Sequence, residues 1–141
     1  MTMHDSGRIA ARILVVDDEA PIVDVVALKL RNAGHEVATA SDGEEALALL
    51  RAPGAAFDLV VTDLQMPALS GLALARAMRG DARLAAIPVV LLTARGHLLR
   101  EGEADSANIV RLIHKPFSPR ALLADIESLL AEGREAGGMA A

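Results

Sequence analysis

The feature that most constrains this chain is the alternation of short apolar runs with longer helical patterns. Five runs of four or five residues are rich in β-branched and other apolar residues; they lie at residues 13–16, 37–40, 57–61, 89–92 and 109–113. Several runs show little alternation of polar and apolar side chains, which is typical of strands buried on both faces. Such strands require helices on both sides of a parallel sheet. The pattern therefore predicts a doubly wound α/β domain with a five-stranded parallel sheet.

Residues that favour helix ends separate these runs. The predicted helices cover residues 20–33, 44–51, 72–79 and 120–131. Gly34 fits the position just past the end of the first helix. The sequence Ser41-Asp42-Gly43-Glu44 matches a capping box, Ser70 fits an N-cap, and Ser118 precedes an N1 proline. We expect a short or mobile further helix within residues 94–107, because Gly96 and Gly102 interrupt its apolar stripe.

Both ends of the sequence differ from this alternating middle. Residues 1–11 are mostly small and polar, and residues 133–141 are rich in Gly and Ala. We expect two flexible tails, at 1–11 and 133–141, flanking one domain at 12–132. The start lacks the apolar stretch of a signal peptide, and no apolar run is long enough to span a bilayer. These observations predict a soluble, cytoplasmic protein.

Composition excludes several kinds of site. A net charge of −5 repels phosphate backbones, so nucleic-acid binding by this chain is not expected. The chain has no Cys, Trp or Tyr, which excludes disulfides, thiolate metal sites and most stacking platforms. The spacing of the four histidines does not match a metal site, and we expect packing or surface roles for them.

Polar residues with useful chemistry follow four of the predicted strands. Asp17-Asp18 follows the first strand, Asp63 the third, Thr93 the fourth and Lys115 the fifth. In open α/β sheets, ligands bind beyond the carboxyl ends of the strands, where these side chains would converge. Taken singly, each residue has an ordinary interpretation as a turn acid, a helix cap or a surface lysine. All five at these spacings together favour one site.

Three converging carboxylates repel one another unless a proton or a cation neutralises them. An oxygen ligand set of this kind suits Mg²⁺. Lys115 adds a positive charge for a phosphoryl oxygen, and Thr93 adds a hydroxyl donor. The chain lacks a Gly-rich phosphate loop, so a bound nucleotide is not indicated. A carboxylate nucleophile that forms an aspartyl phosphate fits this set.

From about residue 12 to 131 the chain resembles the response-regulator receiver family of two-component signalling. The resemblance is carried, in order, by the segments ILVVDDEAPI, FDLVVTDLQMPALSGLAL, PVVLLTA and HKPFSP. It implies a flavodoxin-like fold with strand order 2-1-3-4-5. It also implies that Asp63 is the phosphoacceptor, that Thr93 and Lys115 bond the phosphoryl group, and that the Lys115–Pro116 peptide is cis.

The resemblance further implies a magnesium site. Asp18 and Asp63 would be direct ligands, Asp17 would act through a water molecule, and the backbone carbonyl of Gln65 would complete the set. The chain departs from many receivers at Leu112, where an aromatic residue usually couples to the hydroxyl residue. We therefore expect residues 94–107 to provide the switching element, with increased hydrogen-exchange protection in beryllofluoride and Mg²⁺.

The function implied is a single-domain response regulator that receives a phosphoryl group from a sensor histidine kinase or a histidine phosphotransfer protein. It would signal through contacts with a further protein, without membrane or nucleic-acid binding. Whether it forms a homodimer is left open. The alternatives are a receiver-like interaction module that is never phosphorylated, and a phosphatase of the haloacid-dehalogenase type. Gln65 opposes the phosphatase, because such enzymes typically carry an acid at that position. We expect no turnover of an external substrate.

Overall fold

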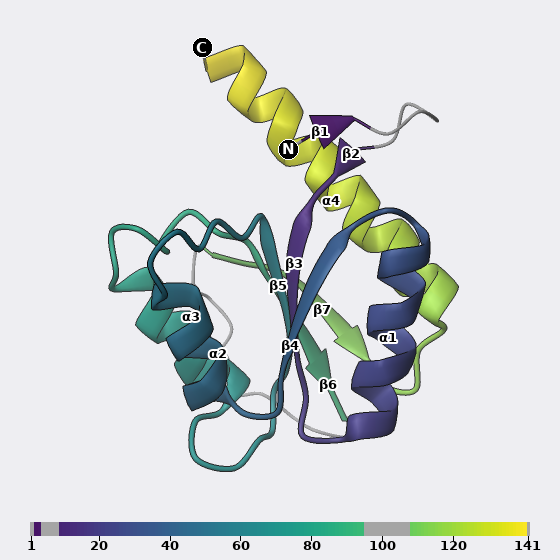
Figure 1. Ribbon diagram of the computed structural model, residues 1–141, viewed down its shortest axis with the longest axis vertical. Coiled ribbons are helices and arrows are strands. Elements are labelled where there is room, and N and C mark those ends of the chain that lie inside the picture. The colour runs from purple at the N-terminus through teal and green to yellow at the C-terminus, as the bar shows by residue number, and fades with distance from the viewer. Residues whose placement is uncertain (1, 4–8, 95–107, 141) are drawn as a thin grey trace.

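The computed structural model describes residues 2–3, 9–94 and 108–140, with backbone alone for residues 2–3, 9 and 134–140. A parallel sheet lies between two layers of helices (Figure 1). Its strands are β3 (Arg12–Val16), β4 (Glu36–Ala40), β5 (Leu59–Asp63), β6 (Val89–Thr93) and β7 (Ile109–His114). The helices are α1 (Ala20–Asn32), α2 (Gly43–Arg51), α3 (Gly71–Arg79) and α4 (Pro119–Ala140). The predicted fold class is therefore confirmed.

The strand order is β4-β3-β5-β6-β7, which is 2-1-3-4-5 in chain order, as predicted. All four pairings are parallel. In this register Val16 pairs with Thr62, and Asp63 pairs with Leu92. Parallel strands place their carboxyl ends at one edge of the sheet, so the residues that follow β3, β5, β6 and β7 lie close together.

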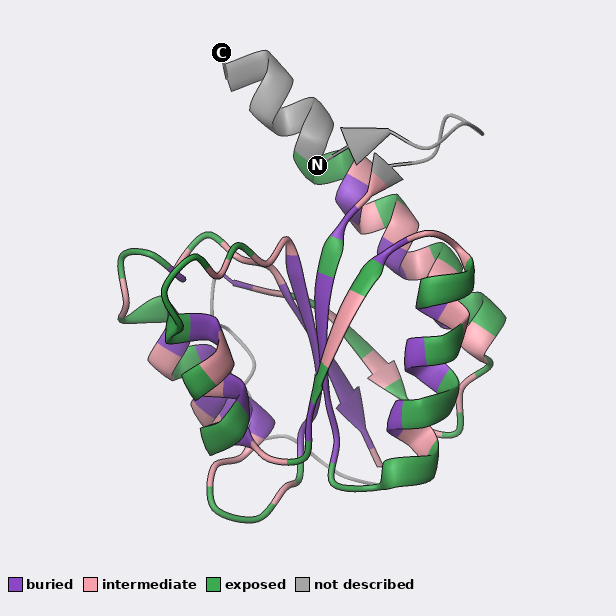
Figure 2. Ribbon diagram, in the orientation of Figure 1, coloured by how far each residue is buried: buried purple, intermediate pink, exposed green. Residues whose placement is uncertain are grey.

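The core has two parts, one on each face of the sheet. On one face, Leu14, Val60 and Leu91 pack with residues of α2 and α3. On the other face, Ile13 and Val61 pack with residues of α1 and α4. The three central strands are almost wholly buried in Figure 2, whereas the edge strands β4 and β7 are not. The prediction of strands buried on both faces thus holds for the centre of the sheet.

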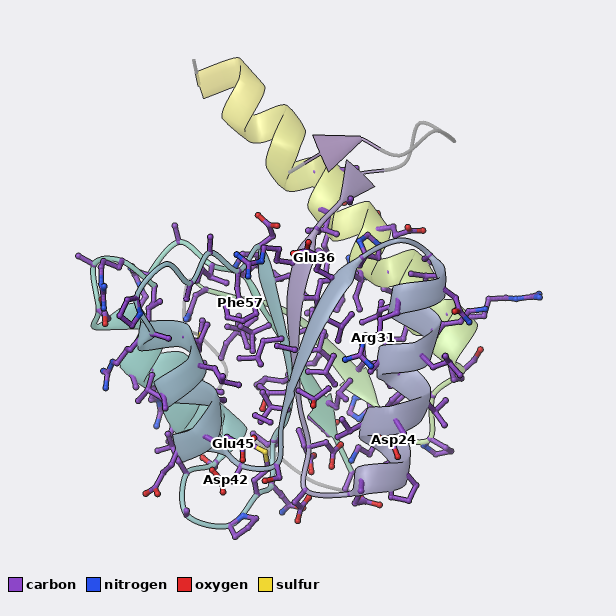
Figure 3. The ribbon with its side chains drawn as sticks, in the orientation of Figure 1. Asp24, Arg31, Glu36, Asp42, Glu45 and Phe57 are labelled. Carbon is purple, nitrogen blue, oxygen red and sulfur yellow. The ribbon has the colours of Figure 1, made fainter. Side chains whose placement is uncertain are left out.

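Short polar side chains cap the helices at the end of the sheet that carries the site. The sequence pattern suggested Ser41 as the cap of α2, but the N-cap is Asp42, whose carboxylate accepts a hydrogen bond from the backbone N–H of Glu45 at 2.8 Å. Ser41 instead donates to the Glu45 side chain at 3.1 Å. Figure 3 shows Asp42 and Glu45 side by side at this end of α2. Ser70 caps α3 as predicted, by accepting from the N–H of Ala73.

A close contact between α3 and β5 fixes the position of Asp63. The N–H of Gly71 donates to the carbonyl of Leu64 at 2.9 Å, which brings the start of α3 against the end of β5. A Cβ at Gly71 would overlap the backbone carbonyl of Asp63. Only glycine allows this approach without a shift of the backbone. In the connecting loop, Ala68 has a positive φ of 67°, an unusual conformation for a residue with a Cβ.

Secondary structure extends into both of the segments that the sequence analysis predicted as tails. Residues expected to form an N-terminal tail contain β1 (Thr2–Met3) and β2 (Ile9–Ala10), which pair antiparallel. Helix α4 continues to Ala140, so the predicted helix end at residue 131 is wrong. Glycine costs an exposed helix about 1 kcal/mol without ending it, and the Ala and Glu residues between the glycines favour helix.

The expected helix and switching element at residues 94–107 lie outside the described residues, apart from Ala94. At the border of this segment, Asn108 is buried and donates to the carbonyl of Ala75 in α3 at 2.8 Å. Among the described residues, none of the helices has both the length and the hydropathy needed for a membrane span.

His35 has the packing role that the sequence suggested. Its side chain is fully buried, and its Nδ1 accepts a hydrogen bond from the backbone N–H of Ala11 at 3.1 Å. The Nε2–H therefore donates to the carboxylate of Glu127, 3.2 Å away. One imidazole thus connects the start of β3, the turn before β4 and helix α4.

Candidate functional site

The carboxyl edge of the sheet brings two of the predicted carboxylates, Asp17 and Asp63, to the ammonium group of Lys115. Nζ of Lys115 lies 2.9 Å from Oδ2 of Asp17 and 3.5 Å from Oδ1 of Asp63. The N–H of Lys115 also donates to the carbonyl of Thr93 at 2.7 Å, which fixes the lysine beside the end of β6. The Lys115–Pro116 peptide is cis, as the resemblance implied. Residues far apart in the sequence thus meet at the end of the sheet.

Four carboxylates form an acidic cluster consisting of Asp17, Asp18, Glu19 and Asp63. One oxygen from each lies within 4.8 Å of the others. Glu19 was not among the predicted site residues; its Oε1 lies 3.3 Å from Nζ of Lys115. The signal was present in the sequence, because Glu19 directly follows the aspartate pair at the start of a predicted helix. The cluster therefore contains one more acid than expected.

The members of the acidic cluster differ in their exposure to solvent. Asp17 and Asp63 are buried, whereas Asp18 and Glu19 are exposed. Both oxygens of Asp17 have protein partners, since Oδ1 accepts from the N–H of Glu19 at 3.0 Å and Oδ2 accepts from Lys115. Asp18 therefore presents the more accessible carboxylate to an incoming cation.

Burial raises the pKa of Asp63 above its ordinary value, and the negative charge of Asp17 raises it further. Lys115 and the backbone N–H of Gln65 act in the opposite direction without cancelling the rise. Burial alone would lower the pKa of Lys115, but its hydrogen bond to Asp17 and the charge of Asp63 outweigh this effect, and the pKa is raised. The cluster thus carries more negative charge than one ammonium group balances.

This donor set fits a hard divalent cation. Three of the four clustered carboxylates contact Lys115, and a cation bound in the cluster would favour the ionised form of Asp63. Mg²⁺ takes one or two carboxylates and keeps several water molecules, which matches an open cluster with two exposed acids. Gln65 contributes its N–H to the Asp63 carboxylate; a role for its carbonyl as a ligand stays a prediction.

The remaining predicted residue, Thr93, is directed to a neighbour that the sequence did not single out. Thr93 is 1% exposed, and its Oγ1 lies 2.8 Å from Nδ1 of His114. His114 was expected to have a surface or packing role, with little influence on the site. Its position directly before Lys115 and opposite Thr93 on the neighbouring strand brings its ring to the hydroxyl.

Comparison with known families gives one match over most of the chain. Residues 13–127 match the model of the response regulator receiver domain. Among solved structures, the chemotaxis response regulator CheY4 of Vibrio cholerae is 33% identical, with a TM-score of 0.75 over 85% of this chain and 98% of that chain. NtrX from Brucella abortus is 34% identical, with a TM-score of 0.80 over 94% of this chain and 29% of that chain.

Curated relatives give the same match over part of their length. The phosphate regulon transcriptional regulatory protein PhoB of Pseudomonas aeruginosa is 38% identical over 120 residues, which is 84% of this chain and 51% of PhoB. The DNA-binding dual master transcriptional regulator RpaA of a Synechocystis strain is 36% identical over 121 residues, 84% of this chain and 48% of RpaA. The chain therefore spans about half the length of these relatives.

Proposed function

Because this chain belongs to the response regulator receiver domain family, we propose that Asp63 accepts a phosphoryl group in a Mg²⁺-dependent reaction. The donor is a phosphohistidine on a sensor kinase or on a histidine phosphotransfer protein. The observation that carries the proposal is the contact of Lys115 with Asp17 and Asp63 inside the acidic cluster. That arrangement combines a buried carboxylate, a fixed positive charge and donors for a cation.

In the proposed transfer, an oxygen of ionised Asp63 forms a bond to phosphorus while the phosphorus–nitrogen bond of the donor histidine breaks. The electron pair of that bond stays on the donor imidazole. Lys115 and the hydroxyl of Thr93 then bond the phosphoryl oxygens. Mg²⁺, when bound, neutralises part of the negative charge that the phosphoryl group brings. Positioning and charge neutralisation are the main contributions that a protein makes to this chemistry.

The proposed metal ligands are the carboxylates of Asp18 and Asp63 and the backbone carbonyl of Gln65, with Asp17 acting through a water molecule. The exposure of Asp18 supports direct coordination. The two hydrogen bonds that Asp17 already makes inside the protein support an indirect contact. Glu19 competes with Asp63 for Lys115 in the absence of a phosphoryl group, since it lies 3.3 Å from the ammonium.

An apolar cleft beside the site supports a protein as the phosphodonor. The cleft has a volume of about 600 Å³ and adjoins Lys115 between α1 and the segment that follows β7. Pro21, Val25 and Phe117 are among its lining residues, and Val25 is 51% exposed. Exposed apolar surface next to a reactive group is typical of a protein contact.

We further propose that residues 12–132 form the receiver domain and act as a single-domain regulator in the cytoplasm, through contact with a downstream protein. The net charge of −5 supports a protein target over nucleic acid for this chain. PhoB and RpaA are named as transcriptional regulators, and the match covers about half of each.

Phosphotransfer to Asp63 is tested by measuring the mass of the intact chain after incubation with acetyl phosphate and Mg²⁺. We expect wild type to gain the mass of one phosphoryl group, and Asp63→Asn to gain none. Chelation of Mg²⁺ should reduce the labelling of wild type. Ser70→Ala provides a matched variant, because it removes a helix cap near the site while all proposed acceptor and metal groups remain.

Three results would contradict the proposal. Labelling of Asp63→Asn at the wild-type rate would place the acceptor elsewhere. An unlabelled wild type, under conditions in which a known receiver reacts, would favour an interaction module that is never phosphorylated. Steady-state release of phosphate from phosphate esters would instead indicate a phosphatase.

A further inference from the structure

The hydroxyl of Thr93 is engaged by a side chain that has no role in the proposed transfer. Oγ1 of Thr93 lies 2.8 Å from Nδ1 of His114. The two residues are register partners on β6 and β7, so their side chains lie on the same face of the sheet. Thr93 is buried whereas His114 is exposed. This hydrogen bond therefore links a buried group at the site to the molecular surface.

The position of the protons in this pair determines whether the Thr93 hydroxyl can donate to a phosphoryl oxygen. A threonine hydroxyl has one proton to donate, and a neutral imidazole has one N–H donor and one acceptor nitrogen. A neutral imidazole in water carries its proton preferentially on Nε2, which leaves Nδ1 as the acceptor. In that form the single proton of Thr93 is directed to His114 and cannot be donated to a phosphoryl oxygen on Asp63.

We propose that His114 is a positioning residue that holds the Thr93 hydroxyl away from the phosphoryl site until Asp63 is phosphorylated. The inference rests on the proposed function, because the phosphoryl group on Asp63 is what competes for the hydroxyl proton. Phosphorylation replaces the bond to His114 with a bond to a charged oxygen, which is the stronger acceptor. The imidazole is then released to solvent.

Release of His114 changes an exposed part of the sheet edge. Side chains two residues apart on a regular strand share a face, so His114 lies in one row with Leu112, whereas Val110 lies at the register shift between β7 and β6. Leu112 is 38% exposed and Val110 is 41% exposed. Because Leu112 pairs with Leu91, which belongs to the core under α2 and α3, the row lies on that side of the sheet. The state of Asp63 is thereby transmitted to a surface row on β7 by way of Thr93 and His114.

The test compares the affinity of the variants for beryllofluoride with Mg²⁺, a mimic of the phosphoryl group, followed by NMR titration. His114→Leu should bind roughly two- to tenfold more tightly, since a typical hydrogen bond of this kind is no longer broken on binding. His114→Asn, whose amide oxygen can accept from Thr93, should stay near wild type. Val110→Ala alters another exposed apolar side chain of β7, which is not a register partner of Thr93, and its affinity should not change.

A double-variant experiment separates coupling from a general effect on the site. In a Thr93→Ala background, His114→Leu should leave the affinity unchanged, because the hydroxyl is already absent. A second readout needs no Mg²⁺: nitrogen-15 NMR of the resting chain should show Nδ1 of His114 without a proton and hydrogen-bonded. Addition of beryllofluoride together with Mg²⁺ should then shift this resonance towards that of a solvated imidazole.

Three outcomes would overturn the proposal. They are equal affinity of wild type and His114→Leu, an effect of His114→Leu that persists without the Thr93 hydroxyl, and a proton on Nδ1 in the resting chain. Each leaves the phosphoacceptor role of Asp63 intact. Failure of wild type to bind beryllofluoride would overturn both proposals, so the two failures are distinguishable.

Discussion

Replacement of Lys115 by Met should destabilise the chain strongly in the absence of Mg²⁺. The ammonium contacts Asp17, Glu19 and Asp63 at 2.9, 3.3 and 3.5 Å. Methionine keeps most of the apolar length of the lysine side chain but removes the charge. Two buried carboxylates then face each other without a cation, and the desolvation of both is no longer offset.

The contacts set the size of this effect. Breaking a buried ion pair by removing one partner costs about 3–5 kcal/mol. The side chain of Lys115 is 15% exposed, so water reaches the site and the lower end of the range applies. We expect a loss of about 3 kcal/mol in the free energy of unfolding. For a chain of this length, that loss corresponds to roughly 10 °C in Tm.

Urea denaturation followed by far-UV circular dichroism measures this loss, because the chain has no Trp or Tyr for fluorescence. Arg111→Met is the matched control on the same strand. Its guanidinium lies 3.5 Å from Asp125, and the two side chains are 38% and 42% exposed. A surface pair of this kind contributes at most about 0.5–1 kcal/mol.

A second replacement distinguishes the effect of lost charge on stability from the effect of altered packing. If unbalanced negative charge causes the loss, Asp63→Asn should restore part of the stability of the Lys115→Met chain. Mg²⁺ should restore stability to Lys115→Met while Asp63 is present. Equal losses in Lys115→Met and Arg111→Met, or no recovery with Asp63→Asn, would refute the reasoning.

Three further predictions concern the same end of the sheet. Asp63→Asn should raise the free energy of unfolding of Mg²⁺-free protein at neutral pH. The reason is that burial raises the pKa of Asp63 above its ordinary value of 3.8. Ionisation of Asp63 therefore lowers the free energy of unfolding as the pH rises from 3.8 through the folded-state pKa. Urea titrations at several pH values should show this loss for wild type but not for Asp63→Asn. The pKa of Lys115 is raised above 10.5, so the contribution of its charge to the free energy of unfolding is complete below pH 10.5 and is lost as the pH rises through the folded-state pKa. Over that pH range, wild type should lose more stability than Lys115→Met. Gly71→Ala should lower the free energy of unfolding by about 1–3 kcal/mol, because its Cβ would overlap the carbonyl of Asp63. A Cβ at Gly80 meets no atom closer than 3.7 Å, so Gly80→Ala should cost less. Thermal denaturation measures both losses.

The sheet and most of the site could be predicted because local signals and the resemblance agreed. Strand runs without alternation indicated burial on both faces, and β5 and β6 are buried at every position. The polar residues at the strand ends indicated the position of the site, and the structure brings Lys115 into contact with Asp17 and Asp63. The inference from strand ends to one site holds because the carboxyl ends of parallel strands all lie at one edge of the sheet.

Two of the features that the sequence did not predict depend on backbone geometry or on a partner that is distant in the sequence. The cap of α2 is Asp42 and not Ser41, because either residue can accept the hydrogen bond and the backbone geometry selects between them. The bond of Thr93 to His114 depends on the register of β6 with β7, which the sequence does not display. The helical extension to Ala140 could not be foreseen from Gly content alone.

Figure 1 places β1 and the end of α4 beyond the amino ends of the parallel strands, on the side of the molecule away from Asp63. A five-residue strand spans about 16 Å, so the length of the sheet separates both chain ends from the reactive edge. Immobilisation through either end would therefore leave the carboxyl edge of the sheet, which carries Asp63, on the side turned towards solution. The attachment surface would then not block a phosphodonor or a partner protein from reaching that edge of the sheet.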